Sequence, residues 1–372
     1  MRFSGPFVGF FTAFLAVACV SDHDALARRD SPGTGGSGGS GGTKGGKDGG
    51  GDASPGDAAA DHGDAWVDAG DDAGSEPDGT NRLTLFHGAV DAPRLAFCAV
   101  RVAEGGAEAA IEPIFPETGL KYATPLVLDG VPGIDVASDA LRLIAVAIDA
   151  SLPAPRCADV LAELERGPAD AGARDAAPPL RAAGLPVLPP GTLSSARSLL
   201  LVVTGCFGGP DHDGPALETV CGRGYTPEKP TLGIALAAMS RRTASGRFGL
   251  QLFHGSRGTE TVGLVTSPPA GIVGPSYFVA SEVRYGQIAP RFANVAHARL
   301  EYGAPFEDAL LEIRREAPEG VNVTWREAML RGGVSAPADG ANFTIVFVGP
   351  LPGTSEPWAN PATLTVVASD PK

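Results

Sequence analysis

The feature of this sequence that most limits its fold is a series of short apolar runs separated by glycine and proline. Each run is rich in Leu, Val and Ile and is only long enough for one strand. Examples lie at residues 83–86, 141–148, 198–203, 343–348 and 364–367. Helix candidates are few and short, at 158–166 and 305–315, and they do not alternate regularly with the strand candidates. The pattern therefore predicts an all-β sandwich architecture and argues against a doubly wound α/β fold.

Four segments of this kind occur twice, in the same order along the chain. The matched pairs are 83–88 with 250–255, 120–123 with 283–286, 198–205 with 342–349, and 231–236 with 363–368. Four matches in one order predict a duplicated domain. We expect two tandem immunoglobulin-like or transthyretin-like β-sandwich domains, the first over residues 82–242 and the second over 247–372. The first copy is longer because of insertions at 154–192 and 206–230.

The first 18 residues have the features of an export signal. Arg2 supplies a positive charge, and residues 7–18 form an uncharged, mostly apolar run of 12 residues. A helix needs about 20 residues to cross a bilayer, so this run is too short for a membrane span. Cys19 follows a small-x-small sequence, which resembles the lipobox of bacterial lipoproteins. We expect a signal peptide at residues 1–18 and lipid attachment at Cys19; the alternative is an ordinary cleavage site and a released chain.

Residues 19–81 predict a disordered linker. Gly makes up 13 of the 26 residues from 31 to 56, and nine carboxylates but no Lys or Arg lie between 52 and 78. Such a segment cannot bury enough apolar surface to offset the entropy lost on ordering. With a lipid on Cys19, it would act as a tether that holds the folded part off the outer membrane or at the cell surface.

The charge balance bears on possible partners. The chain has a formal net charge of −14, and residues 1–81 alone hold 13 of its 43 acidic side chains but only 5 of its 29 basic ones. Affinity for nucleic acid depends on clustered Lys and Arg, so nucleic acid is excluded as a partner. Much of the acidity belongs to the tether, and the folded part is only mildly acidic.

The cysteine count fits an export route. If Cys19 carries a lipid, four of the five cysteines remain, an even number as expected outside the cytoplasm. Four cysteines allow three pairings. We favour Cys206–Cys221, which would close a loop rich in Gly, Pro and Asp, and this leaves Cys98 to pair with Cys157. Zinc is the rival interpretation, but no two of these cysteines have the short spacing of a zinc site.

Candidate metal ligands are sparse. Asp211 and Asp213 flank a histidine inside the proposed disulfide loop, with Glu218 as a third carboxylate. Calcium takes six to eight oxygen ligands, and the spacing of a calcium loop is absent here. We therefore expect a solvated loop tip, with Asp211 and Asp213 as a weak calcium candidate, and no cofactor.

Three polar residues fall at the ends of predicted strands. His87 and His254 occupy matching places in the two copies, and we expect each ring to bond backbone groups of the loop that follows. A functional histidine pair is the alternative. Asp91 is expected to bond backbone N–H groups of its own turn, just before Pro93.

The segment 85–93, which reads LFHGAVDAP, resembles the opening of a bacterial envelope family of unknown function, domain family 4397. That family begins with a strand that ends in His and continues through a turn with Asp and Pro, here Asp91 and Pro93. It later carries a Tyr-Gly turn, which Tyr285 and Gly286 resemble.

The resemblance extends over nearly all of residues 82–372, as two copies. It implies a secreted β-sandwich, often in tandem, with no established activity. The second copy departs from the pattern at 258–260, where Gly-Thr-Glu replaces the Asp-Ala-Pro of the first copy. The resemblance therefore implies a role for this turn in the first copy only.

Together these features predict a non-catalytic surface lipoprotein of the bacterial cell envelope with a structural or adhesive role. Its partners would be the membrane, through the lipid, and an envelope protein or polysaccharide. The alternative is a module that captures a sugar, peptide or small molecule, which would need a deep pocket lined by aromatics such as Tyr277, Phe278 and Tyr285. A third hypothesis is a hydrolase with Ser256 as nucleophile, but the β pattern after Ser256 does not suit a G-x-S-x-G elbow.

Overall fold

The computed structural model describes residues 82–131, 133–135, 138–149, 152–166, 181–193, 198–241, 247–269, 271–274, 276–297, 306–315, 320–335, 341–354 and 356–369. The predicted signal peptide, Cys19 and the predicted tether lie outside these residues. The described strands belong to one compact unit. Below, the first half denotes the described residues up to 241, and the second half those from 247 onward.

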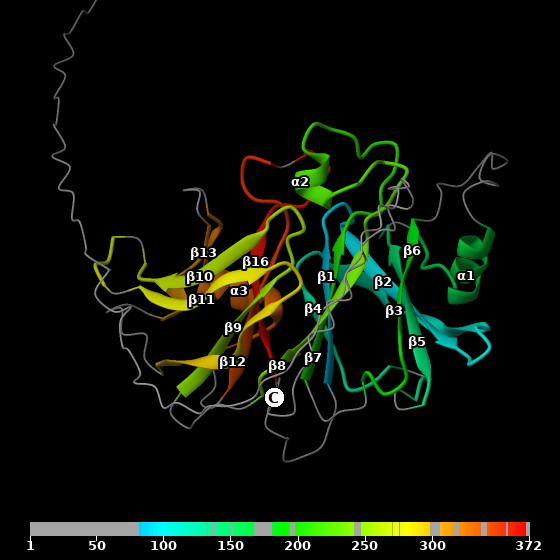
Figure 1. Ribbon diagram of the computed structural model, residues 1–372, viewed down its shortest axis with the longest axis horizontal. Coiled ribbons are helices and arrows are strands. Elements are labelled where there is room, and N and C mark those ends of the chain that lie inside the picture. Colours follow the sequence, from blue (N-terminus) through cyan, green and yellow to red (C-terminus); the bar gives the residue numbers. More distant parts are fainter. Residues whose placement is uncertain are drawn as a thin grey trace, which may run out of the picture. The chain divides into compact units, whose positions relative to one another are not determined.

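The first half consists of two four-stranded sheets (Figure 1). The outer sheet has the order β3-β2-β5-β6 and the inner sheet the order β4-β1-β7-β8. The outer strands are β2 (Arg94–Val102), β3 (Glu108–Lys121), β5 (Ala140–Ala147) and β6 (Ala182–Leu188). The inner strands are β1 (Arg82–Ala89), β4 (Pro125–Leu128), β7 (Ser198–Gly205) and β8 (Gly233–Met239).

The second half has the same strand order. Its inner sheet runs β12-β9-β15-β16 and its outer sheet β11-β10-β13-β14. The inner strands are β9 (Arg247–His254), β12 (Ile288–His297), β15 (Asn342–Val348) and β16 (Thr363–Ala368). The outer strands are β10 (Thr261–Ser267), β11 (Tyr277–Arg284), β13 (Leu310–Arg314) and β14 (Asn322–Thr324). The predicted all-β class is thus confirmed.

The strand register is also the same in both halves. β1 pairs in parallel with β7, with Leu85 opposite Leu201, and β9 pairs in parallel with β15, with Leu252 opposite Ile345. These are the residues that the sequence repeat places at matching positions. Each sheet takes all its strands from one half only.

The two inner sheets pack face to face, so each is buried on both sides. On β7, Leu199, Leu201 and Val203 enter the core of the first half, while Leu200 and Val202 enter a core shared with the second half. Side chains alternate between the faces of a strand, so burial on both faces requires a continuous apolar run. This explains why the runs at 198–203 and 343–348 do not alternate with polar residues.

The shared core joins strands from both halves. From the first half it takes side chains of β1, β7 and β8, and from the second half side chains of β9, β15 and β16. Phe86 and Phe253, which the sequence repeat matches, are both fully buried there. Figure 1 shows the four sheets side by side: the outer sheet of the first half, the two inner sheets, and the outer sheet of the second half.

Among the described residues, three α-helices lie outside the sheets. α1 (Cys157–Arg166), close to the predicted 158–166, packs against the outer face of the outer sheet, mainly over β3. α2 is the short Leu217–Cys221 segment, and α3 spans Trp325–Gly332. A capping box between Thr324 and Glu327 begins α3, and Trp325 is buried in the core of the second half.

The helix predicted at 305–315 is wrong. Phe306–Asp308 forms one 3-10 turn, and β13 follows. In β13 the side chains of Leu311 and Ile313 are buried, while Glu312 between them and Arg314 after them are more exposed, so the true period is two rather than 3.6.

Candidate functional site

The two histidines of the repeat fix matching turns. In His87 the Nε2–H donates to the carbonyl O of Ala92 at 3.0 Å, and Nδ1 accepts from the N–H of Ala89 at 3.3 Å. In His254 the corresponding partners are the carbonyl O of Thr259 at 3.0 Å and the N–H of Ser256 at 3.3 Å. The predicted capping of the following loop is confirmed for both rings.

These contacts and the burial keep both rings neutral. Nδ1 is an acceptor in each, which requires the tautomer with the proton on Nε2. Burial lowers the pKa of His87 to about 3 and that of His254 to about 4, because the charged imidazolium would lose its hydration. Neither histidine is set up as an acid or base near neutral pH.

The Asp91 side chain is the centre of a buried polar cluster. Its carboxylate is fully buried, and it accepts hydrogen bonds from the backbone N–H groups of Phe207 and Gly208, both at 3.0 Å. It also contacts the Arg181 guanidinium at 2.7 Å and His212 Nδ1 at 2.9 Å. The prediction that Asp91 bonds its own turn is wrong, because its partners lie about 90 to 120 residues further along the chain. Pro93 is exposed at the turn before β2.

The calcium candidates do not converge. Asp213 accepts from the N–H of Gly214 at 2.8 Å, and Asp211 is exposed. His212 between them turns inward to Asp91 and stacks on Trp358, with ring centroids 4.9 Å apart. In the part of the chain that the structure describes, no three His, Cys, Asp or Glu side chains come together as a metal site.

Both disulfides favoured from the sequence are present. Cys98–Cys157 ties β2 to α1, and Cys206–Cys221 closes the loop after β7, each with a Cα–Cα distance of 5.3 Å. A small apolar cluster that includes Val90, Val220 and Tyr225 packs around the second bond.

The loop closed by Cys206–Cys221, together with its continuation to residue 231, connects the two halves. The N–H of Ala216 donates to the buried Glu356 carboxylate at 2.7 Å, and Trp358 Nε1 donates to the carbonyl O of Asp213 at 3.1 Å. A further link runs from the side chain of Asn360 to the carbonyl O of Ala92 at 3.0 Å. Figure 1 shows α2 next to residues 349–354 and 356–362 of the second half.

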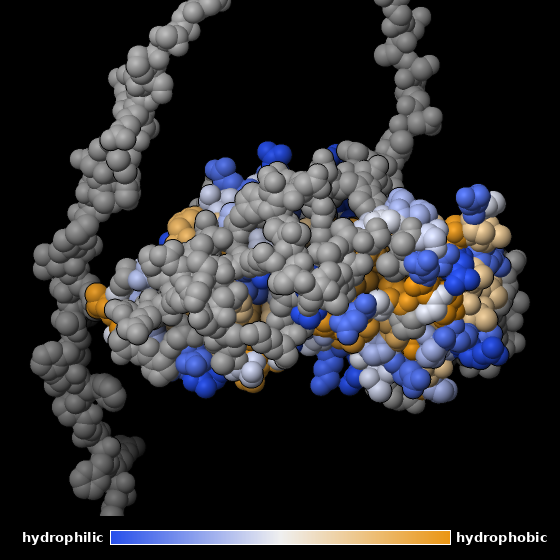
Figure 2. Space-filling view, turned by 90° about the horizontal axis from the view of Figure 1, so that it is seen from below, coloured by the Kyte–Doolittle hydropathy of each residue, from blue (hydrophilic) through white to orange (hydrophobic). Residues whose placement is uncertain are grey.

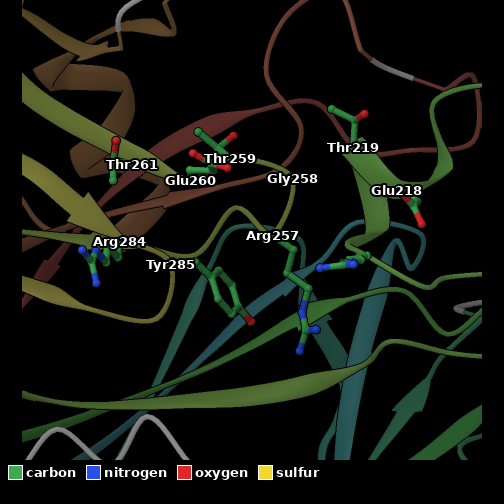
Figure 3. A pocket seen from close by; sticks show the side chains of 10 residues that line it. Glu218, Thr219, Arg257, Gly258, Thr259, Glu260, Thr261, Arg284 and Tyr285 are labelled. Atoms are coloured by element: carbon green, nitrogen blue, oxygen red, sulfur yellow. The ribbon is translucent and has the colours of Figure 1, made fainter. Parts of the chain in front are cut away.

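An open pocket of about 730 Å³ lies beside this loop (Figure 3). The first half contributes Glu218, Thr219 and Arg223, all from the α2 region. The second half contributes the turn after β9 and the end of β11. The residues of the second half that line the pocket are Arg257, Gly258, Thr259, Glu260, Thr261, Arg284 and Tyr285.

The pocket is built on the turn where the second half departs from the first. Gly258 occupies the place that Asp91 has in the first half, and a Cβ at Gly258 would collide with the backbone of Thr219. Only glycine therefore lets the α2 loop approach this turn. The preceding Arg257 stands where the first half has Val90.

Arg257 is held in place from three sides. Its Nε donates to Thr204 Oγ1 at 3.3 Å, and its guanidinium carbon lies 5.3 Å from the centroid of the Tyr285 ring. Its stem runs over glycines, since Cβ atoms at Gly205 and Gly222 would lie only 3.1 Å from it. Figure 3 shows the side chain extended beside Tyr285.

The sequence predicted only part of this pocket. Tyr285 and Gly286 were singled out as a turn, and Gly286 does adopt φ +77° and donates its N–H to the carbonyl O of His254 at 2.8 Å. The three arginines were missed, although the departure at 258–260 was a signal. The aromatic pocket required for ligand capture is not formed as expected, because Phe278 is 62% exposed and Tyr277 packs against the core of the second half.

Comparison with known proteins adds no family: no family model and no curated protein matches the chain. Among the described residues, no helix is both long and apolar enough to span a membrane.

Proposed function

We propose that this chain is a non-catalytic lipoprotein of the bacterial cell envelope, anchored through Cys19, whose folded part has a structural or adhesive role. The sequence supports the anchor through the short apolar segment before Cys19 and the Gly- and Asp-rich segment after it. The resemblance to domain family 4397 supports the same location.

The observation that carries the proposal is the filled, four-sheet interior. Three apolar cores run through the stack, and the middle one is shared by both halves. The buried polar side chains near the ends of β1 and β9 fix turns and loops, as the contacts of His87, His254 and Asp91 show. Such an arrangement suits a rigid body that presents loops and surfaces to a partner. Figure 2 shows hydrophilic and hydrophobic residues side by side on the described part of one such face.

The contacts of Ser256 give little support to the hydrolase alternative. Its Oγ contacts Thr259 Oγ1 at 3.4 Å, and its backbone N–H, rather than its hydroxyl, meets the ring of His254. Ser256 is also buried. The alternative of ligand capture is favoured by one observation, the open pocket beside Arg257.

The proposed role predicts a phenotype in cells. Cells that lack the chain should lose surface adhesion or envelope integrity, and the full chain should restore it. A Cys19→Ala chain should restore it poorly, because the folded part would be released. A Ser256→Ala chain should restore it fully, since the proposal assigns Ser256 no chemistry. Restoration by Cys19→Ala but not by Ser256→Ala would overturn the proposal.

A further inference from the structure

The open pocket contains more positive charge than its contacts neutralise. Arg223, Arg257 and Arg284 all line it, and within the described residues none of them has a carboxylate within ion-pair distance. Two carboxylates, Glu218 and Glu260, line the same pocket, and one Glu218 oxygen accepts from the N–H of Gly224 at 3.2 Å.

Arg257 is the least exposed of the three arginines and the most firmly held. Only its Nε is used, in the bond to Thr204, and the ring of Tyr285 and the glycine backbone fix its plane. The outer edge of a guanidinium carries further N–H donors in a rigid fork, which matches the two oxygens of a carboxylate. An arginine that is already ordered loses little further entropy when it binds.

We propose that this pocket binds an acidic sugar unit of a glycan chain, with Arg257 bonding the carboxylate of the sugar. This inference rests on the proposed adhesive function and names its ligand. Arg223 and Arg284, both exposed, add attraction for the negative charge from the rim of the pocket.

The remaining lining residues favour a sugar. Thr219, Thr259 and Thr261 bring hydroxyl groups, and Glu218 and Glu260 bring acceptors for the hydroxyls of a sugar. Apart from Tyr285 and Gly258, the lining residues labelled in Figure 3 all carry polar or charged side chains. The two carboxylates would repel a densely charged polyphosphate more strongly than a chain with one charge per sugar unit. The pocket is open to solvent, so one unit of a longer chain can enter it from outside.

The test is calorimetric titration of the full-length chain in detergent at low salt. The probes are a galacturonic acid oligomer, a neutral galactose oligomer of the same length, inorganic phosphate, and vesicles containing phosphatidylglycerol. We expect binding of the galacturonic acid oligomer only, with affinity that falls as salt is added.

Variants assign the binding to the pocket. Arg257→Gln should weaken binding of the acidic oligomer by about tenfold or more, the loss typical of a bond to a charged group. Because Arg257 also packs at the boundary of the two halves, the exposed pair Arg223→Gln with Arg284→Gln provides a second variant, which should weaken binding severalfold without lowering the melting temperature. Arg156→Gln, an exposed arginine on the first half outside the pocket, should bind as wild type does.

Three results would overturn the inference: no binding of the acidic oligomer, equal binding of the neutral oligomer, or equal affinity of the pocket variants and wild type. Binding of phosphate or vesicles alone would also overturn it and would point to a phosphorylated ligand. If the acidic oligomer does not bind but adhesion in cells depends on Cys19, only the glycan ligand is ruled out. If adhesion in cells does not depend on the chain or on Cys19, the proposed function itself is ruled out.

Discussion

Tyr122 and Tyr285 stand at matching positions of the two halves, and the hydroxyl of each reaches a residue of the other half. Tyr122 donates to the carbonyl O of Pro361 at 3.2 Å, and the Tyr285 hydroxyl bonds that of Thr204. Each ring also packs edge-on against the histidine of its own half, His87 for Tyr122 and His254 for Tyr285. The repeat thus gives a contact between the halves that is made twice, in opposite directions.

Removal of either hydroxyl should loosen this boundary. Tyr122→Phe and Tyr285→Phe should each lower the free energy of unfolding by about 1 kcal/mol, the usual net value of one hydrogen bond. Urea denaturation followed by tryptophan fluorescence measures the change. A Tyr285→Phe chain as stable as wild type would mean that the crossing hydroxyl does not tie the halves together.

The buried histidines predict a loss of stability in mild acid. Their folded pKa values of about 3 and about 4 lie below the usual 6.5, so from pH 6.5 down to about 4 the unfolded chain binds protons that the folded chain does not. The free energy of unfolding should therefore fall as pH falls, by up to about 1.4 kcal/mol per pH unit for each histidine.

The measurement is the urea midpoint between pH 7 and pH 4.5. His254→Gln should be less stable at pH 7 but should show a shallower dependence on pH, because one of the two buried rings is gone. His212→Gln removes a histidine that bonds a carboxylate rather than a carbonyl and serves as control. An unchanged slope in His254→Gln would contradict the assignment of a buried neutral ring.

Asp91 should be among the residues most important for stability. In Asp91→Ala, the N–H groups of Phe207 and Gly208 lose their acceptor and Arg181 loses its buried partner. We expect a loss of about 3 kcal/mol. The matched control is Asp139→Ala, which breaks the more exposed Arg101–Asp139 pair and should cost less than about 1 kcal/mol. Equal losses for the two variants would rule out the central role of Asp91.

The sequence predicted much of this fold because strand patterns and repeats are local signals. The runs at 198–203 and 343–348 are continuous because their strands are buried on both faces, and the LFHG segments lie at matching strand ends. The error at 305–315 arose because Phe306, Leu310 and Ile313 are spaced at i, i+4 and i+7, which also fits one face of a helix. The capping box at Thr324 and Glu327 was a readable signal for α3 that was missed.

The site was harder to predict because its contacts join distant parts of the chain. Asp91 meets His212, 121 residues away, and Arg257 meets Thr204, 53 residues away. No spacing rule in one sequence connects such positions. The one local sign was that Gly258 replaces the Asp of the first half, and only the structure shows that this glycine makes room for the backbone of Thr219.

The Cys206–Cys221 bond should hold the pocket as well as the loop. Replacing both cysteines with Ala should cost roughly 3 kcal/mol, the value expected for a loop of this length in the chain-entropy account. The variant should also become sensitive to protease within residues 206–231, and it should bind the acidic oligomer more weakly, because Thr219 and Arg223 belong to this segment. The Cys98–Cys157 bond ties α1 to β2, away from that loop. The double variant that replaces both of these cysteines with Ala should therefore be destabilised without a change in protease cleavage of the 206–231 loop. Loop cleavage that is equal in the two double variants would contradict this account.

The central claim, that the chain is a lipid-anchored envelope protein, is tested most directly by incorporation of labelled palmitate in bacterial cells. The full chain should take up the label and remain in the membrane fraction, and the Cys19→Ala chain should take up none. A chain that carries no label, with Cys19→Ala fractionating as wild type does, would contradict the account.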